Sequence, residues 1–304
     1  MKTVVVTGAS GFVGRWCVEA LAAAGVAVVG VGRGPRPASM PALADWVQAD
    51  VLDEQGIARI AAVGGDTLVH FAWTTEHGVY WSSGDNLDWA GATLRLARAF
   101  HAGGGRRFVG VGTCAEYDAD ALSRPLDEAA PCLHPSTLYG AAKAATARLL
   151  AAHASQTGAS FAWSRLFHLH GPGEDRRRLV PSVALKVLAG DVAACSSGRQ
   201  RRDFMHVGDA GAAIAAVALS GLQGPVNIGS GRETSVGEVA RITAAAAGRA
   251  DLLRLGALPD RPNDPPMLLP DVSRLTEIGY KPKRDLETGL AETVAWWRQE
   301  MTEQ

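Results

Sequence analysis

Residues 2–14 read KTVVVTGASGFVG, a short apolar run that breaks into a turn with regularly spaced glycines. The run is β-branched, as expected of a buried parallel strand. Gly8, Gly11 and Gly14 then permit a tight turn, a close backbone approach to a pyrophosphate and close helix packing. The helix that follows would present free N–H groups to phosphates. Because the first gap is one residue longer than in the usual dinucleotide fingerprint, a purely structural glycine turn remains an alternative here.

Length and charge restrict the class of protein and of partner. The chain has 304 residues, 47% of them hydrophobic, which is enough for one large core or two smaller ones, and we expect two lobes. A net charge of −1 gives no general attraction to nucleic acid or to an anionic membrane, so a small-molecule partner is expected. Because the first strand begins directly after Met1, and no apolar stretch reaches spanning length, we expect a cytoplasmic protein.

The four cysteines are widely scattered and form no CxxC pair or Cys/His cluster: Cys17, Cys114, Cys132 and Cys195. This spacing argues against a structural zinc ion and against a disulfide framework. We therefore expect free thiols and no metal site.

Strand and helix patterns alternate through the first half of the chain. Strands are predicted at residues 4–6, 26–31, 46–49, 67–72, 107–111 and 160–166. Helices are predicted between them at residues 15–24, 54–62, 86–101 and 137–154. This alternation indicates an α/β fold with a doubly wound, Rossmann-type parallel sheet.

The alternation fades after residue 171. Helices are predicted at residues 181–189, 207–219, 236–247 and 286–299, with a short strand at 226–228. We expect a dinucleotide-binding domain over residues 1–170, to which residues 203–224 return, and a smaller C-terminal α/β substrate-binding lobe over residues 171–304.

The ends of the second and third strands bear on the cofactor. Folds that prefer NAD usually place Asp or Glu at the end of the second strand, whereas folds that take NADP leave space and supply arginine. This chain has Gly32, Arg33, Gly34 and Arg36 there, which favours NADP, with NAD still possible and a solvated loop as the alternative. Asp50, at the end of the third strand, is the candidate for the adenine amino group.

The loop at residues 73–83 follows the fourth strand, at the sheet edge where ligands bind in α/β proteins. Glu76, His77 and Tyr80 are substrate candidates, although loop aromatics that only cover a cleft are an equal alternative. The basic run at residues 176–178 is interpreted as a solvated edge or a binding element.

The chemical signal is LYGAAK, in which Tyr139 and Lys143 stand four residues apart on one helix face. A phenol titrates near pH 10 in water, and a nearby ammonium favours the phenolate. Tyr139 would then serve as general acid or base, with Thr113 at the end of the fifth strand holding the reacting oxygen.

With these residues in place, the whole chain resembles the extended short-chain dehydrogenase/reductases, in particular the nucleotide-sugar epimerase, dehydratase and reductase family. The family's TGxxGxxG, its Ser/Thr and its YxxxK are matched at residues 7–14, at Thr113 and at residues 139–143. RLFHLHGPG, RRDFMHVGDAG, VNIGSG and RPNDPP match later family segments, at residues 165–173, 201–211, 226–231 and 261–266.

The resemblance implies roles for individual residues. Thr113, Tyr139 and Lys143 would be catalytic. The cofactor would be bound by Gly8, Ser10, Gly11, Phe12, Val13, Gly14, Arg33, Asp50, Val51, Phe71, Ala72, Tyr139 and Lys143. The substrate, a nucleotide-diphosphate sugar, would be bound by Glu76, His77, Tyr80, Thr113, His168, Val180, Arg202 and Arg261. Arg202 and Arg261 are implied as diphosphate contacts, with salt-bridged surface arginines as the alternative.

Two departures from the family pattern matter. His168 and His170 stand where the family usually has Asn and Tyr, which alters contacts around the nucleotide or sugar. Dehydratases place Asp and Glu after the Thr, whereas this chain has Cys114 and Ala115, which counts against 4,6-dehydration. Cys114 is either an acid or base itself or a buried inert thiol.

The sequence therefore favours NADPH-dependent reduction of a nucleotide-linked 4-keto-6-deoxy sugar at C4. The alternative is a nucleotide-sugar 4-epimerase that keeps NAD tightly bound, and a more remote one is a non-catalytic NADP(H)-sensing protein. We also expect a homodimer that pairs the alanine-rich helices 86–101 and 137–154 of two subunits.

Overall fold

The computed structural model describes residues 2–42, 44–117, 125–128, 133–262 and 264–303. Cys132 lies outside these residues. No helix in the described part of the chain is long and apolar enough to cross a membrane.

A seven-stranded, fully parallel sheet forms the centre of the fold, which confirms the predicted doubly wound architecture. Across the sheet the strands are β11 (Gly224–Ile228), β6 (Ser160–Leu166), β5 (Arg107–Thr113), β4 (Thr67–His70), β1 (Thr3–Thr7), β2 (Ala27–Gly32) and β3 (Ala44–Gln48). The chain proceeds outward from β1 in one direction to β3 and then in the other direction from β4. Ligands bind at the carboxyl ends of the strands beside such a reversal, between β1 and β4.

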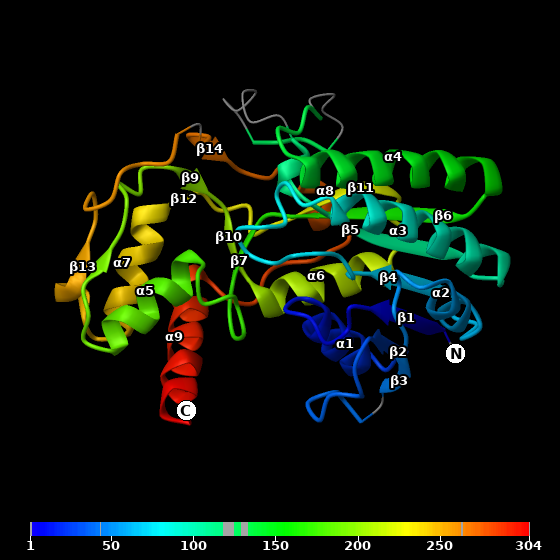
Figure 1. Ribbon diagram of the computed structural model, residues 1–304, viewed down its shortest axis with the longest axis horizontal. Coiled ribbons are helices and arrows are strands. Elements are labelled where there is room, and N and C mark those ends of the chain that lie inside the picture. The colour runs from blue at the N-terminus through cyan, green and yellow to red at the C-terminus, as the bar shows by residue number, and fades with distance from the viewer. Residues whose placement is uncertain (1, 43, 118–124, 129–132, 263, 304) are drawn as a thin grey trace.

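Helices cover both faces of this sheet (Figure 1). One face carries α1 (Gly14–Ala23) and α6 (Val207–Leu219), and the other carries α2 (Glu54–Ala61), α3 (Asp85–Ala102) and α4 (Leu138–Thr157). Alternation along β1 supplies both cores: Val4 and Val6 pack on the α1 side, and Val5 packs on the α2 and α3 side. All three valines are at most 1% exposed, so the strand that leads into the glycine turn is held from both faces.

The helix boundaries follow local stop signals. The last predicted helix of the first half was expected to end at residue 154, but α4 continues to Thr157. It ends where Gly158 adopts a left-handed conformation with φ 71°. No glycine or proline precedes that position in the helix after Gly140, so nothing in the chain stops the helix earlier.

The predicted short strand at 226–228 has a different place from the one expected. It belongs to β11, which pairs with β6 as an edge strand of the main sheet rather than lying in the smaller lobe. The helix α8 (Ser273–Glu277) packs near β11, since Leu275 and Val226 belong to one core. The return of residues 203–224 to the dinucleotide-binding domain stays a prediction.

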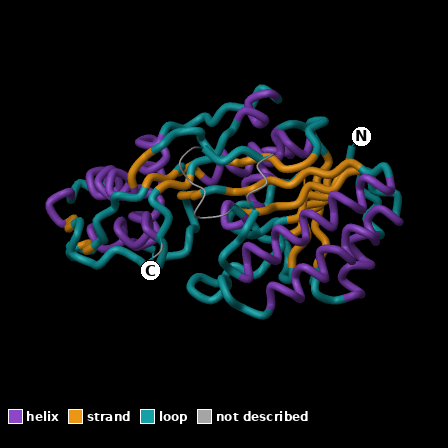
Figure 2. The backbone as a smooth tube through the Cα atoms, turned by 90° about the horizontal axis from the view of Figure 1, so that it is seen from above, coloured by secondary structure: helices purple, strands orange, loops and turns teal. Residues whose placement is uncertain are grey.

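The remaining elements gather beyond the carboxyl edge of the sheet (Figure 2). Their core joins α5 (Leu179–Leu188), α7 (Val236–Ala246) and α9 (Leu286–Thr302). The short pairings are β7 (His168–His170) with β10 (Phe204–His206), β8 (Ala193–Ala194) with β13 (Leu253–Arg254), and β9 (Arg201–Arg202) with β12 (Thr234–Ser235) and β14 (Met267–Leu268). Two short 3-10 turns complete the described elements, η1 (Cys114–Glu116) and η2 (Ala250–Leu252). The proposed division into two domains remains a prediction.

Candidate active site

The glycine turn between β1 and α1 has the geometry of a phosphate cradle. Gly8 has φ +67°, and a Cβ there would lie 2.9 Å from the backbone nitrogen of Ala72, so only glycine fits between the ends of β1 and β4. A Cβ on Gly14 would overlap the carbonyl oxygen of Gly8. No side chain caps α1, whose N-cap residue is Val13 and whose first turn holds no acidic group. The start of α1 therefore suits an anionic group, and the residues present fit a dinucleotide pyrophosphate.

The adenosine side of this cradle is formed by the ends of β2 and β3. Asp50 is half-buried, and its Oδ1 accepts a hydrogen bond of 3.0 Å from the N–H of Leu52. Arg33 is exposed, and no described residue bonds its guanidinium, whereas the Arg36 guanidinium donates to Pro41 O and to Ala44 O. Arg36 therefore acts as a structural residue of its loop. Arg33 remains available to a ligand.

Thr113 lies at the carboxyl end of β5 and is 9% exposed. Its Oγ1 accepts from Ala115 N at 3.2 Å and caps the short turn η1. Its own N–H donates to Oε1 of Glu116 at 2.9 Å. The backbone of Thr113 is thus fixed by a buried carboxylate while its hydroxyl lies at the sheet edge.

Tyr139 lies in the first turn of α4, which Thr137 caps by accepting from Gly140 N at 3.1 Å. Burial raises the pKa of Tyr139 above its ordinary value, and the neighbouring Tyr80 raises it further. A hydrogen bond with Thr113 acts in the opposite direction. Tyr139 is therefore a protonated phenol at neutral pH, able to donate a proton beside Thr113.

Lys143 is 3% exposed, and its Nζ donates to Val111 O at 2.7 Å. The same Nζ lies 3.8 Å from the ring centroid of Trp73. Burial lowers the pKa of Lys143 to about 7, although Glu116 raises it. The sequence led us to expect that Lys143 would favour the phenolate of Tyr139. In the structure the ammonium faces Val111 and Trp73 instead, and the pKa of Tyr139 is raised.

The loop at residues 73–83 packs directly on the Tyr139 phenol. The Tyr80 ring is 4.8 Å from the Tyr139 ring at 82°, and the Trp81 ring is 5.8 Å from it at 89°. Tyr80 is 6% exposed, and burial raises its pKa to about 12 while a hydrogen bond with Arg178 lowers it. The alternative of aromatics that cover the site therefore describes Tyr80 well, and it does not conflict with the predicted substrate role.

Basic groups surround the far side of the site. His168 is half-buried, and its pKa falls to about 3 because of burial and then because of Arg202 and Arg178. Burial also lowers the pKa of His77, with contributions from Arg178 and from the exposed Arg261. The predicted residues Glu76 and Val180 differ in setting, because Glu76 is exposed and Val180 is 1% exposed. Converging positive charge of this kind suits a diphosphate.

Arg202 is 3% exposed and donates from its NH2 group to Asp264 Oδ1 and to Pro265 O, each at 2.7 Å. Arg202 is therefore salt-bridged but buried, whereas the alternative interpretation expected a salt-bridged arginine at the surface.

The sequence did not predict several residues that contact the site residues: Trp73, Asn86, Glu116, Arg165 and Arg178. Arg178 belonged to a basic run that had two open interpretations, and its position as N-cap of α5 turns it toward Tyr80 and His168. Glu116 and Arg165 form an ion pair of 2.8 Å with side-chain exposures of 0% and 4%. Because these two residues are 49 positions apart, no local sequence pattern indicates that they pair.

Other titratable groups at the site are structural. His70 is 1% exposed, with Nδ1 2.7 Å from Thr7 Oγ1 and Nε2 2.9 Å from Thr93 Oγ1. Burial raises the pKa of the Cys114 thiol to about 11, which favours the inert-thiol alternative. Within the described residues, no group of three or more His, Cys, Asp or Glu side chains is placed to hold a metal ion.

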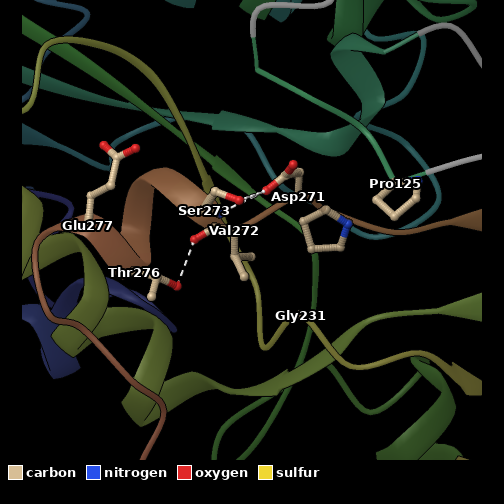
Figure 3. Close-up of a pocket in the computed structure, with 8 residues that line it drawn as sticks. Pro125, Gly231, Asp271, Val272, Ser273, Thr276 and Glu277 are labelled. Atoms are coloured by element: carbon tan, nitrogen blue, oxygen red, sulfur yellow. Dashed lines mark hydrogen bonds between the residues drawn. The ribbon is translucent and has the colours of Figure 1, made fainter.

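A separate open pocket of about 530 Å³ lies beside α8 (Figure 3). Its lining residues are Pro125, Gly231, Pro270, Asp271, Val272, Ser273, Thr276 and Glu277. One of its two carboxylates is already engaged, because Asp271 Oδ1 accepts from both the N–H and the hydroxyl of Ser273. The pocket contains no predicted site residue.

A family model described as the NAD dependent epimerase/dehydratase family matches residues 4–229. The chain belongs to this family. One relative is a dTDP-4-dehydro-6-deoxy-D-allose reductase of Streptomyces bikiniensis, which is 30% identical over 98% of this chain and 96% of that protein. A dTDP-glucose 4,6-dehydratase of an Actinoplanes species is also 30% identical, over 97% of each chain. The solved UDP-glucose 4-epimerase of Thermus thermophilus in complex with NAD is 25% identical, with a TM-score of 0.83 and coverage of 97% and 99%.

These similarities confirm the resemblance to the extended short-chain dehydrogenase/reductases and their Rossmann-type sheet. The present protein is an enzyme of the nicotinamide-dependent nucleotide-sugar group.

Proposed function

We propose that the protein reduces a nucleotide-diphosphate-linked 4-keto-6-deoxy sugar at C4, with NADPH as the reductant. The observation that carries this proposal is the site at the end of β5, where Tyr139 lies beside Thr113. Cys114 and Ala115 follow Thr113 in the chain. This site holds a proton donor for a carbonyl oxygen. It lacks, at these two positions, the acid and base that elimination of water needs. Two relatives that are each 30% identical to this chain are named dTDP-4-dehydro-6-deoxy-D-allose reductases, which supports the same reaction class.

The chain's residues divide the work as follows. When bound, NADPH would supply a hydride to the C4 carbonyl carbon. Thr113 orients the carbonyl oxygen by hydrogen bonding, and Tyr139 donates its phenolic proton to that oxygen as negative charge develops. Lys143, fixed by Val111 O, would bind the nicotinamide ribose.

The remaining residues hold the two ligands in place. Gly8, Gly11 and Gly14 with the start of α1 would receive the pyrophosphate of the coenzyme, and Asp50 the adenine. Arg178, Arg202 and Arg261 would bind the diphosphate of the sugar nucleotide. Tyr80 and Trp81 would keep water from the reacting carbonyl, because their rings lie against Tyr139.

The coenzyme choice rests on the end of β2, where Gly32 replaces an acidic residue and the guanidinium of Arg33 is exposed. A 2′-phosphate would meet that charge. We also propose a cytoplasmic homodimer that uses the outer faces of α3 and α4. Leu87 on α3 is 63% exposed and Leu149 on α4 is 55% exposed, and apolar side chains of this size gain from being covered.

The second candidate is a nucleotide-sugar 4-epimerase, favoured by the resemblance to the UDP-glucose 4-epimerase solved in complex with NAD. The same residues would then act with Tyr139 first as base. Its signature is NAD that stays bound through purification and is released on denaturation.

One variant tests the proposed role of the phenol. Tyr139→Phe should bind NADPH nearly as tightly as the wild type and lose turnover, because only the proton donor is removed. Calorimetric titration and stopped-flow absorbance at the NADPH band measure the two quantities. Unchanged turnover in Tyr139→Phe would contradict the catalytic assignment.

A further inference from the structure

The indole of Trp46 lies flat across the end of β2, over two glycines. Trp46 pairs with Gly30 in the register between β2 and β3. A Cβ built on Gly30 would lie 2.9 Å from Trp46 Cε3, and one on Gly32 would lie 2.7 Å from Cη2 and 2.8 Å from Cζ2. All three distances are shorter than packed carbon atoms allow. The space that a side chain at position 32 would need is already filled by Trp46.

The indole is held in this position. Its Nε1 donates to Gly34 O at 3.1 Å, and next to it on β3 the side chain of Gln48 donates to Arg33 O at 2.9 Å. Moving the ring off Gly32 would break the first of these bonds and remove the ring from Gly30. The two β3 side chains thus fix the backbone carbonyls of residues 33 and 34, while the Arg33 guanidinium stays exposed.

We propose that Trp46 is a coenzyme-selecting residue, because it occupies the volume of the carboxylate by which NAD-binding folds hold the adenosine ribose. That carboxylate accepts hydrogen bonds from the ribose hydroxyls at the end of β2. Indole carries a donor and no acceptor, and its donor is already used by Gly34, so it offers the 2′-hydroxyl no partner. A 2′-phosphate instead meets Arg33. This inference rests on the proposed use of NADPH and adds the residue that enforces it.

The carboxylate can be introduced at two neighbouring glycines that differ in the space around them. Gly32→Asp places it against Trp46, whereas Gly34→Asp is a matched control because nothing lies within 4 Å of a Cβ there. The double variant Gly32→Asp/Trp46→Val makes room for the same carboxylate, and Trp46→Val alone completes the cycle. Gly32→Ala, with and without Trp46→Val, repeats the steric test with a smaller group in case Gly32→Asp does not fold.

Thermal midpoints and calorimetric affinities for NADPH and NADH are measured on each purified variant. We expect Gly32→Asp and Gly32→Ala to lower the midpoint, and Trp46→Val to recover part of that loss. Gly34→Asp should keep the wild-type midpoint, because nothing crowds the added side chain. The double variant should shift the ratio of NADH to NADPH affinity toward NADH by about tenfold or more, since a charged hydrogen bond is gained and phosphate binding is opposed.

Two results would overturn the role of Trp46: a Gly32→Asp protein as stable as the wild type, or a double variant with the wild-type affinity ratio. A wild-type preference for NADH is a different result. It would contradict the proposed NADPH-dependent function, whereas the change in ratio between the wild type and the double variant measures the effect of Trp46 alone.

Discussion

The ammonium of Lys143 lies 3.8 Å from the ring centroid of Trp73, the first residue of the loop that also covers Tyr139. Trp73 Nε1 in turn donates to Oδ1 of Asn86 at 2.9 Å. The amide nitrogen of Asn86 donates to Tyr80 O at 2.7 Å and to Ser83 O at 2.8 Å. The Asn86 side chain, which is 0% exposed, therefore bonds both ends of the loop that contacts Lys143 and Tyr139.

Replacing Asn86 tests this link. Asn86→Ala leaves the Trp73 N–H and the Tyr80 carbonyl without their partner, at a cost of about 1–3 kcal/mol for each buried group left unsatisfied. We expect a lower urea midpoint and a lower kcat, because the loop no longer holds Lys143 and Tyr139 in register. Asp88→Asn, an exposed change on the same helix, is the control. Equal midpoints and kcat for the two variants would show that Asn86 has no such role.

The low pKa of Lys143 makes a prediction about stability and pH. Burial lowers that pKa from 10.5 to about 7 in the folded protein. Between these pH values the unfolded chain binds a proton that the folded chain does not, so the contribution of Lys143 to the free energy of unfolding rises with pH across this window. Urea unfolding of the wild type and of Lys143→Met, at several pH values from 6.5 to 9.5, isolates the contribution. A difference between them that stays constant with pH would contradict the shift.

The buried pair of Glu116 and Arg165 supports Thr113. Glu116→Gln leaves Arg165 without its counter-charge in a position that is 3% exposed, and breaking such a pair costs about 3–5 kcal/mol. Glu238→Gln removes one partner of an exposed ion pair with Arg241, where a change below about 1 kcal/mol is expected. Denaturant midpoints compare the two. Similar small losses would mean that the buried pair contributes little to stability.

The proposed role of Arg178 in substrate binding can be tested directly. Arg178→Lys keeps a positive charge beside the buried Glu174 but loses the planar fork that binds phosphate oxygens in pairs. We expect KM for the sugar nucleotide to rise about tenfold with a smaller change in kcat. Arg177→Lys is the neighbouring control, because Arg177 is exposed and paired with Asp175. A KM that rises equally in both variants would remove Arg178 from the diphosphate site.

Local patterns predicted much of this molecule. The β-branched run at residues 4–6, the glycine spacing and the alternation of strands and helices specify the sheet and its binding edge. Tyr139 and Lys143 were recognisable because both are on one helix and four residues apart. In these cases the determining information lies within a few residues of the element it specifies.

What the sequence could not provide depends on contacts between distant segments. The role of Asn86 depends on its contact with the loop at residues 73–83, and the role of Trp46 depends on the packing of β3 against the glycines of β2. Neither contact can be predicted from a local pattern. The expected effect of Lys143 on Tyr139 assumed that the ammonium faces the phenol, whereas burial and Val111 O determine where it points. The position of β11 beside β6 likewise follows from long-range pairing.

The central claim is that the protein transfers a hydride from NADPH directly to C4 of a 4-keto sugar nucleotide. The most direct test is a reaction with NADPH deuterated at the nicotinamide C4, followed by NMR of the sugar product. Our account predicts a reduced sugar that carries deuterium at C4, with one NADPH consumed for each sugar formed, and no product with Tyr139→Phe. Interconversion of C4 epimers with no net NADPH consumed and no deuterium in the product would contradict it.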